Sequence, residues 1–416
     1  MRRRRLWALL LAALMLSGCW DLTSIEDVAY VVSIGVDKAE EEFLWTFRVV
    51  EAESLPVGMM TVAPNPTGEN ELSSGLMTAR ARTLEQAVQV LQPSFARILS
   101  LEHVRFVILG EEVARERLGL LLSQFLRHHE IRRAAGMAVA RGRAVDVFRE
   151  NQPVGERNPA KFLEGVLLAQ KRFHLSPPMR VQHFYNRVAA PGLDAVLPLI
   201  SVNEGARGEP GSPLPAMGSR SLKAGEFPRN GGNPTEVAGM AVFHKDRLMG
   251  MLDVNESIAI LALRGEMGKV YQTVPDLEGR PITIRYGQET KPQYRVSLDG
   301  ENAAVQIRLV IDGELICVAG MTDYTEPTMR RQLEEHIAAF ADATVYNPLV
   351  RKLYNEWGAD PIGLGQVVRR RFPTFLHWME YGWSDRIQEV VVTVQTEFFV
   401  RRFGLLIEQP EELGGC

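Results

Sequence analysis

Cysteine is scarce in this sequence, which excludes a fold held together by disulfides. The 416 residues include three cysteines, at positions 19, 317 and 416. Cys317 lies in the apolar run 314–319, which predicts a buried thiol in a strand. A Cys317–Cys416 bridge would suit an extracytoplasmic protein, but a single bridge does not organise a chain of this length.

Motifs that carry known catalytic chemistry are also missing. The sequence has no His-Glu-x-x-His metal site, no Gly-x-Ser-x-Gly nucleophile elbow and no P-loop. Gly363-x-Gly365 is followed by valine at position 368, where a dinucleotide fingerprint needs glycine, so it predicts a tight turn and cap before a helix 366–371. His128 and His129 are neighbours, and neighbouring side chains on a helix point about 100° apart. They therefore predict a solvated helix end, and no metal ligand or catalytic residue is expected.

Long apolar runs and an excess of basic charge are absent beyond the N-terminus. After residue 18 no stretch reaches eighteen consecutive apolar residues, so the body of the chain is not expected to span a membrane. The formal charge is −4, and removing residues 1–18, with four arginines and no acid, makes it −4 − 4 = −8. A mildly acidic protein is a poor nucleic-acid binder, and no nucleic-acid partner is expected.

The N-terminus does carry a clear pattern. Four arginines at positions 2–5 precede the unbroken apolar run Leu6–Leu16, the layout of an export signal. Eleven apolar residues rise only about 16 Å as a helix, half of a bilayer core. The closing residues resemble a bacterial lipobox: Leu16, Ser17, Gly18 and Cys19.

The lipobox resemblance implies that Cys19 becomes the acylated first residue of the mature chain. It would carry diacylglycerol, with or without an added N-acyl chain, and no other cofactor is expected. Two or more acyl chains anchor a protein stably, whereas one is marginal. The rival interpretation is an ordinary cleaved signal whose cysteine later forms a disulfide.

Periodicity along the mature chain predicts an α+β class, multi-domain, with mixed or antiparallel sheets and helices packed on them. Alternating or β-branched runs predict strands at 28–37, 44–52, 103–109, 137–140, 239–243, 248–252, 282–286, 293–298, 304–311 and 390–399. Apolar spacing of three and four predicts helices at 83–91, 111–124, 144–150, 162–170, 256–263, 328–344 and 349–357, with Pro348 breaking or kinking the last pair.

Composition divides the chain. Twelve of the thirty residues 205–234 are Gly or Pro, which predicts a linker or long loop. The expected organisation is a signal peptide at 1–18, an N-terminal domain at 19–204, the Gly/Pro-rich segment at 205–235, a C-terminal domain at 236–410 and a tail at 411–416.

Several stretches together resemble the Ger(x)C family, the C subunit of spore nutrient germinant receptors. They follow in order over nearly the whole mature chain: 18–21 with 25–26 and 34–37, 101–104 through 108–112, 239–243 with 248–253, 360–365, 369–373 with Trp378, and 400–405. Asn347-Pro348 departs from the pattern, because an uninterrupted helix is expected there.

The resemblance implies a non-catalytic lipoprotein on the outer, extracytoplasmic face of the spore inner membrane. It would support assembly and signal relay with the integral-membrane A and B subunits, to which small germinants are attributed. The rival function is a solute-binding lipoprotein of an importer, with an extracytoplasmic hydrolase as a more distant third.

Some residues are candidates for contact with a partner or a membrane. Trp20 and Asp21 follow the lipidated cysteine, and Trp20 is suited to the bilayer interface. The basic run of Arg369, Arg370 and Arg371 would suit headgroups or an acidic partner, although such a run is more often a solvated face. Trp378, Tyr381 and Trp383 are expected to fill the core beneath the last strand.

Overall fold

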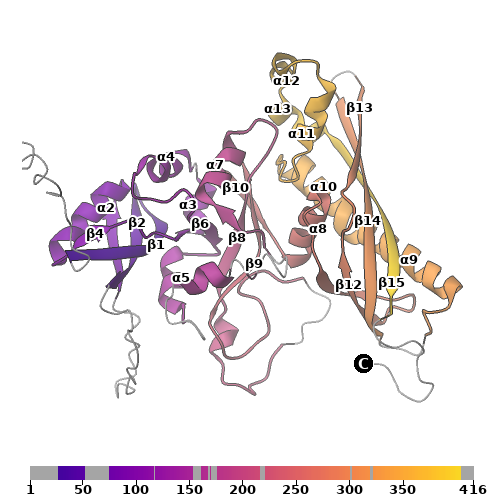
Figure 1. Cartoon of the computed structure of the whole chain (residues 1–416), viewed down its shortest axis with the longest axis horizontal. Helices are drawn as coiled ribbons and strands as arrows, with labels where there is room; N and C mark the ends of the chain where they lie inside the picture. Colours follow the sequence, from indigo (N-terminus) through magenta and orange to yellow (C-terminus); the bar gives the residue numbers. More distant parts are fainter. Residues whose placement is uncertain are drawn as a thin grey trace, which may run out of the picture.

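The computed structural model describes residues 27–51, 75–116, 118–152, 161–166, 169, 176–215, 221–299, 302–318 and 322–403. Within these ranges the chain forms two sheets with helices packed on them (Figure 1). The predicted α+β class, with mixed sheets, is confirmed.

The larger sheet has the order β10-β9-β8-β6-β5-β1-β2-β3, with β4 beside β1 and β7 beside β6. Its centre, β1-β5-β6-β8, is parallel and both of its flanks are antiparallel. The strands are β1 Val28–Ala39, β2 Glu42–Glu51, β3 Leu76–Ala81, β4 Ile98–Ser100, β5 Phe106–Leu109, β6 Gly136–Ala140, β7 Met179–Arg180, β8 Val196–Val202, β9 Thr235–His244 and β10 Arg247–Leu252.

Helices cover both faces of this sheet because its central strands are apolar on both sides. In β5, Val107 and Leu109 belong to one buried cluster, while Phe106 and Ile108 belong to another that includes Phe148 of α5. Such alternation follows from the two-residue period of a strand. Figure 1 shows α4 and α7 on one side of the sheet and α5 on the other. The helices are α2 Leu84–Leu91, α3 Glu111–Arg115, α4 Gly119–Arg127, α5 Ala144–Glu150 and α7 Val181–Ala189.

The smaller sheet has the order β11-β12-β14-β13, with β15 pairing in parallel along β14. Buried and more exposed residues alternate along β14, so one face packs on the core and the other faces solvent, as the half-exposed pattern predicted. The strands are β11 Val270–Pro275, β12 Pro281–Gly287, β13 Gln293–Asp299, β14 Asn302–Val318 and β15 Val391–Arg402.

Helices on the smaller sheet include one long helical run. It consists of α9 Pro327–Ala341, α10 Asn347–Arg351 and two π-helical turns, Asp342–Tyr346 and Lys352–Glu356. Of the two alternatives predicted at Pro348, the break is wrong, because the helical run continues through this residue, and the kink stays a prediction. In the π turn just before Pro348, the Asn347 N–H donates to the Asp342 carbonyl, five residues back. The helical run continues although Pro348 has no N–H to donate. The other helices are α8 Val254–Arg264, α11 Leu364–Val368, α12 Phe375–Tyr381 and α13 Trp383–Arg386.

Side chains of this helical run complete the free edge of β15. The Asn347 side chain accepts from the Val394 N–H at 2.9 Å and donates to the Val394 carbonyl at 3.2 Å. Asp342 accepts from the Thr396 N–H at 2.9 Å, and Glu334 accepts from the Val400 N–H at 2.7 Å. An uncovered edge strand exposes unpaired backbone groups to other chains, and here a helix satisfies them.

The Gly/Pro-rich segment connects β8 to β9, which are adjacent antiparallel strands of the larger sheet. The predicted strands 239–243 and 248–252 are present as β9 and β10, which form a hairpin at one flank of that sheet. The hairpin therefore packs with the N-terminal half of the chain, although it follows the segment predicted as a linker.

Candidate functional site

The stretch 360–365 folds around one buried carboxylate. Asp360 is 1% exposed, and its side chain accepts from the N–H groups of Gly363, Leu364 and Gly365 at 2.7, 2.8 and 2.6 Å. These N–H groups begin α11 and have no partner inside the helix. Asp360 therefore provides the turn and cap that the glycine pattern predicted.

A second carboxylate joins Asp360 to the larger sheet. Asp194, just before β8, accepts from the Asp360 N–H at 2.8 Å, and its own N–H donates to the Asp360 carbonyl at 2.9 Å. The Asp194 side chain also contacts His244 Nδ1 at 3.0 Å and accepts from the Lys245 N–H at 2.9 Å, at the β9–β10 turn. We call Asp194, Asp360 and their partners the junction, because they connect the two sheets.

Two arginines complete the junction from different elements. Arg187 of α7 donates to the Pro361 carbonyl at 3.0 Å, and Arg264 of α8 donates to the same oxygen at 2.8 Å. Arg187 also donates to the Asp194 carbonyl at 3.0 Å. The short loop at Pro361 is thus held by helices from both halves of the chain.

Burial sets the electrostatics of the junction. It raises the pKa of Asp360, against the opposing effect of the hydrogen bonds from Tyr354 and the backbone, and it raises the pKa of Tyr354. Burial also lowers the pKa of Arg187. Burial and the neighbouring Arg187 charge lower the pKa of Arg264 to about 9. The carboxylates and guanidiniums sit near one another at little solvent exposure, which favours a fixed geometry.

Two glycines let the backbones cross at the junction. An added Cβ at Gly365 would lie 2.7 Å from Gly192 Cα and 2.7 Å from Trp383 Nε1. Trp378 and Trp383 are buried and Tyr381 is half-buried. The prediction that these aromatics fill the core is confirmed for Trp378 and Trp383, which belong to the buried cluster that includes Val394 of β15. Their indole rings lie where a Cβ at Gly192 or Gly365 would stand.

A similar carboxylate cap lies inside the larger sheet. Asp37, at the end of β1, accepts from the N–H groups of Ala144 and Val145 at 2.7 and 2.9 Å and so caps α5. An added Cβ at Gly110 would lie 2.2 Å from this carboxylate, and one at Gly35 would lie 2.6 Å from the Phe148 ring. The stretches 34–37 and 108–112 are therefore parts of one packing arrangement.

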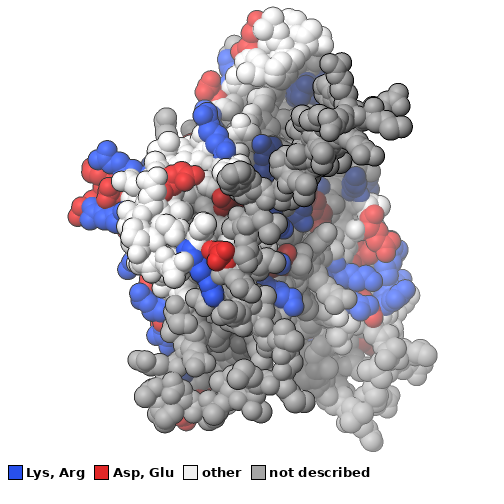
Figure 2. Space-filling view, turned by 60° about the vertical axis from the view of Figure 1, so that its left-hand side comes forward, with Lys and Arg blue, Asp and Glu red and all other residues white. Residues whose placement is uncertain are grey.

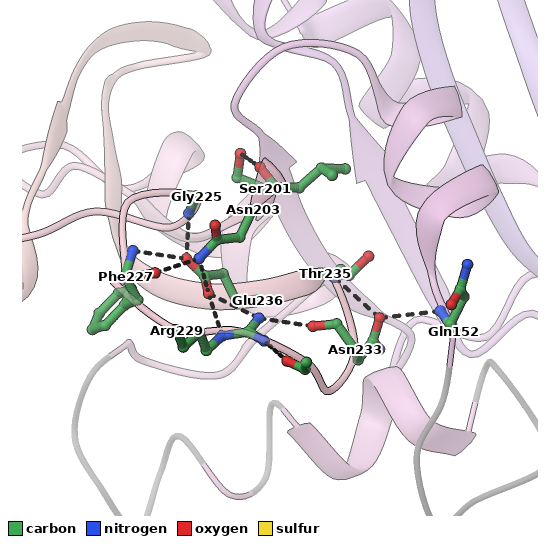
Figure 3. A network of polar contacts seen from close by, with 11 residues as sticks. Gln152, Ser201, Asn203, Gly225, Phe227, Arg229, Asn233, Thr235 and Glu236 are labelled. Carbon is green, nitrogen blue, oxygen red and sulfur yellow. Dashed lines mark hydrogen bonds and ion pairs between the residues drawn. The ribbon is translucent and has the colours of Figure 1, made fainter. Parts of the chain in front are cut away.

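Polar side chains fix the Gly/Pro-rich loop (Figure 3). The Glu236 side chain accepts from Gly225 N–H at 2.6 Å, Asn203 Nδ2 at 3.1 Å and Arg229 Nε at 3.1 Å. Arg229 also donates to the Asn233 carbonyl at 2.7 Å. The described part of this loop is thus tied to its own ends, as in a compact surface loop.

The predicted lipidation site lies outside the described residues. Those residues begin at 27, so the structure describes none of Leu16, Ser17, Gly18, Cys19, Trp20 and Asp21. Cys416 is also outside them, and the bridge to Cys317 stays a prediction. Cys317 itself lies in β14 and is half-buried rather than buried, because it stands near the end of the strand where the core thins.

The basic run is found at the surface. Arg369, Arg370 and Arg371 form a 3-10 turn after α11, so the predicted helix 366–371 is in fact α11 followed by this turn. All three are exposed. The guanidinium of Arg371 donates to the Val296 carbonyl at 3.0 Å, and that of Arg369 lies 5.0 Å from the Phe375 ring centre.

The histidine pair differs partly from prediction. His129 is 86% exposed, as a solvated helix end requires, but His128 is 8% exposed and lies 2.8 Å from Glu85 of α2. The prediction that His128 is solvated is therefore wrong, because α2 lies beside the end of α4 and covers this side chain. Among the residues that the structure describes, no group of three or more His, Cys, Asp and Glu side chains is placed to hold a metal ion.

Surface charge is mixed in sign. Figure 2 shows Lys and Arg interleaved with Asp and Glu in small groups over the described part of the visible face. Ion pairs such as Lys38–Glu116 and Arg80–Glu42 account for this mixing. No helix in the described ranges is long and apolar enough to cross a membrane.

Sequence reasoning missed the partners of Asp360. Arg187, Asp194 and Arg264 stand alone in the sequence, 173, 166 and 96 positions before Asp360, with no motif around them. A buried arginine or aspartate is costly unless paired, but burial of these isolated residues is not visible in local periodicity.

Comparisons with known proteins agree with the fold. Residues 21–202 match a family model described as the spore germination protein N-terminal domain, and residues 238–404 match one described as spore germination B3/GerAC like, C-terminal. The crystal structure of the GerBC protein superposes with a TM-score of 0.52 at 16% sequence identity, over 88% of this chain and 96% of that one.

Relatives in Bacillus subtilis (strain 168) have related names. Spore germination protein B3 is 20% identical over 405 residues, 94% of this chain and 95% of its own length. The putative spore germination protein YfkR is 28% identical over 260 residues, 61% of this chain and 59% of YfkR. The match to YfkR thus spans less than two thirds of that relative.

Two domain models in order, with a shared fold, define a spore germination protein. The chain belongs to the Ger(x)C family. The stretches at the Asp37 cap and in the junction, 34–37, 108–112 and 360–365, are among those on which the resemblance was based.

Proposed function

We propose that this chain is the non-catalytic C subunit of a spore nutrient germinant receptor. It is anchored by lipid on Cys19 at the extracytoplasmic face of the spore inner membrane. With the integral-membrane A and B subunits it supports receptor assembly and relays the germination signal. Family membership and the names of the relatives support the germination role.

The junction is the observation that carries the relay role. Its two carboxylates hold backbone N–H groups and its two arginines share one carbonyl oxygen, so these polar groups hold two sheets in fixed positions. A displacement at one sheet is passed to the other through buried hydrogen bonds rather than absorbed in a flexible linker. Such an element suits a scaffold or relay more than a catalyst.

The basic turn with α12 is the surface that we propose for contact with anionic headgroups. Arg369 and Arg370 are exposed beside the exposed apolar residues Phe375, Leu376 and Met379 of α12, at the upper end of the molecule in Figure 1. Arginines attract anionic lipid while apolar side chains enter the interface, and a lipid anchor would keep the chain beside the bilayer.

Vesicle sedimentation tests this surface without the anchor. For a chain that begins at residue 20, phosphatidylglycerol vesicles are expected to retain the protein, and Arg369→Gln with Arg370→Gln should reduce retention several-fold. Arg330→Gln with Arg331→Gln on α9 removes the same charge elsewhere. If both double variants lost vesicle retention equally, retention would depend on net charge alone, which would contradict a headgroup contact at the basic turn.

Spores carrying Cys19→Ala test the proposed function. The N-terminal peptide of the wild-type protein should have the mass of diacylglyceryl-Cys19, and the variant spores should lose nutrient-triggered germination. An unmodified cysteine would refute the anchor. Lipidated Cys19 with unchanged germination in spores that lack related receptors would favour the rival function, a solute-binding lipoprotein of an importer.

A further inference from the structure

A cavity beside the junction has the features of a small-molecule site. It is a half-open pocket of about 680 Å³ beside β7, α7 and the end of α8. This volume lies in the usual range for small-molecule pockets. Its lining combines apolar residues with the polar residues Ser176, His183, Asn186, Arg187, Arg264 and Glu266.

A buried hydroxyl in this lining lacks a partner. Ser176 is 1% exposed, and its Oγ has no hydrogen-bond partner among the described residues. Burying a hydroxyl without a hydrogen bond costs about 1–3 kcal/mol. The Oγ itself is closed off from solvent, so a rotation of the Ser176 side chain toward the cavity would present this donor to a ligand oxygen.

Two arginines also line the cavity. The Arg264 side chain is 5% exposed and lines the cavity with Arg187. Arg187 donates to the Pro361 carbonyl through Nη2, and Arg264 donates to it through Nε. Among the described residues, neither Nη1 group has a hydrogen-bond partner. The nearest carboxylate to Arg264 Nη1 is Glu266, at 3.9 Å. Two guanidiniums with spare N–H groups form a donor site that a carboxylate can accept from.

The rest of the lining is mainly apolar. Pro177, Pro178, Met179 and Leu261 would contact a hydrocarbon group, and a pocket that is mainly apolar with a few convergent polar groups is typical of small-ligand sites. We propose that this cavity binds a small carboxylate with an apolar body, its carboxylate on Arg264, Arg187 and the Ser176 hydroxyl. This inference goes beyond the receptor role and does not depend on it.

Titration of the full chain in detergent with 3-methylbutanoate tests the proposal. The probe has a carboxylate and a branched apolar body, and its uncharged amide has the same shape. Ligand-observed NMR at neutral pH is expected to give a dissociation constant on the order of millimolar for so small a ligand. The amide should bind at least tenfold more weakly, because it cannot form charge-assisted hydrogen bonds.

Matched serine variants locate the site. Ser176→Ala is expected to weaken binding of the carboxylate about tenfold. Ser33→Ala removes a hydroxyl that is equally buried and equally unpartnered, but in β1 away from the cavity, and should leave binding unchanged. Neither change breaks a hydrogen bond of the described chain, so both variants should fold.

Arg264→Gln should abolish detectable binding. If this variant fails to fold, because Arg264 also holds the Pro361 loop, the serine pair still decides the question. Equal binding of acid and amide, equal affinities of Ser176→Ala and Ser33→Ala, or no binding up to about 50 mM would each overturn the proposal. Normal germination of Cys19→Ala spores would leave this test unaffected.

Discussion

Single buried residues hold this fold at its most demanding points. Asp360 satisfies three N–H groups at the start of α11, and Asp37 satisfies two at the start of α5. Both lie in stretches that the resemblance singled out. Each carboxylate joins a turn to a neighbouring element. These two stretches therefore mark structural contacts of the fold.

Asp360→Asn should lower the free energy of unfolding by about 1–3 kcal/mol, because one N–H of the cap loses its acceptor. Burial raises the pKa of Asp360, so its protonation favours the folded state. That contribution is complete below the unfolded pKa, 3.8, and is lost as pH rises through the folded pKa. The penalty should therefore be larger at about pH 4.5 than at about pH 7.5.

Urea unfolding at both pH values measures this penalty. Asp299→Asn, at an exposed position at the end of β13, is the matched control and should change stability little. An equal penalty for Asp360→Asn at both pH values would contradict the raised pKa.

Gly365→Ala should destabilise the junction by about 1–3 kcal/mol or more, since the new Cβ overlaps the Gly192 backbone. Gly165→Ala is the control, because an added Cβ there meets nothing within 4 Å. Thermal unfolding of the two variants makes the comparison. Similar melting temperatures of the two variants would mean that the backbones at Gly365 and Gly192 can move apart without loss of stability.

At the scale of elements, the long helical run explains the departure seen at Asn347-Pro348. A π turn precedes Asn347, and Pro348, which has no N–H, follows it. The Asn347 side-chain amide pairs with the backbone of β15. π turns often mark positions where a helix serves a specific contact. In this helix that contact closes the edge of a sheet.

Asn347→Ala should lower stability by about 1–3 kcal/mol, because it leaves the Val394 N–H and carbonyl without their partner. The exposed edge should also increase aggregation. Asn302→Ala, at the exposed start of β14, is the control. Chemical unfolding and light scattering would test both effects, and identical behaviour of the two variants would contradict the edge-pairing role.

At the scale of the whole molecule, the hairpin β9–β10 and the junction make the two halves interdependent. The hairpin flanks β8, whose residues 196–201 are all buried. Asp194 and Arg187 from the N-terminal half contact Asp360 and Pro361 from the C-terminal half. A boundary placed by composition at 205–235 therefore passes through one sheet.

A fragment of residues 19–204 should aggregate, because it leaves the apolar strand β8 without its neighbour. A fragment of residues 19–265, which restores β9, β10 and α8, should be more soluble and retain its circular dichroism. Size-exclusion chromatography compares the two. A monomeric, folded 19–204 fragment would show that this half is independent of the hairpin.

The sequence alone determined the class of the fold, most strand and helix positions, including the start of the helix predicted at 83–91, and the family, because these depend on local periodicity and contiguous motifs. Thr83 does accept from the Gln86 N–H, at 3.2 Å. Only the tertiary structure decided that 205–234 joins two strands of one sheet, that Pro348 lies within a continuous helical run and that Arg187, Asp194 and Arg264 meet at Pro361. Those contacts join residues far apart in the chain, and the free energy that pairs them comes from burial, which local sequence does not encode.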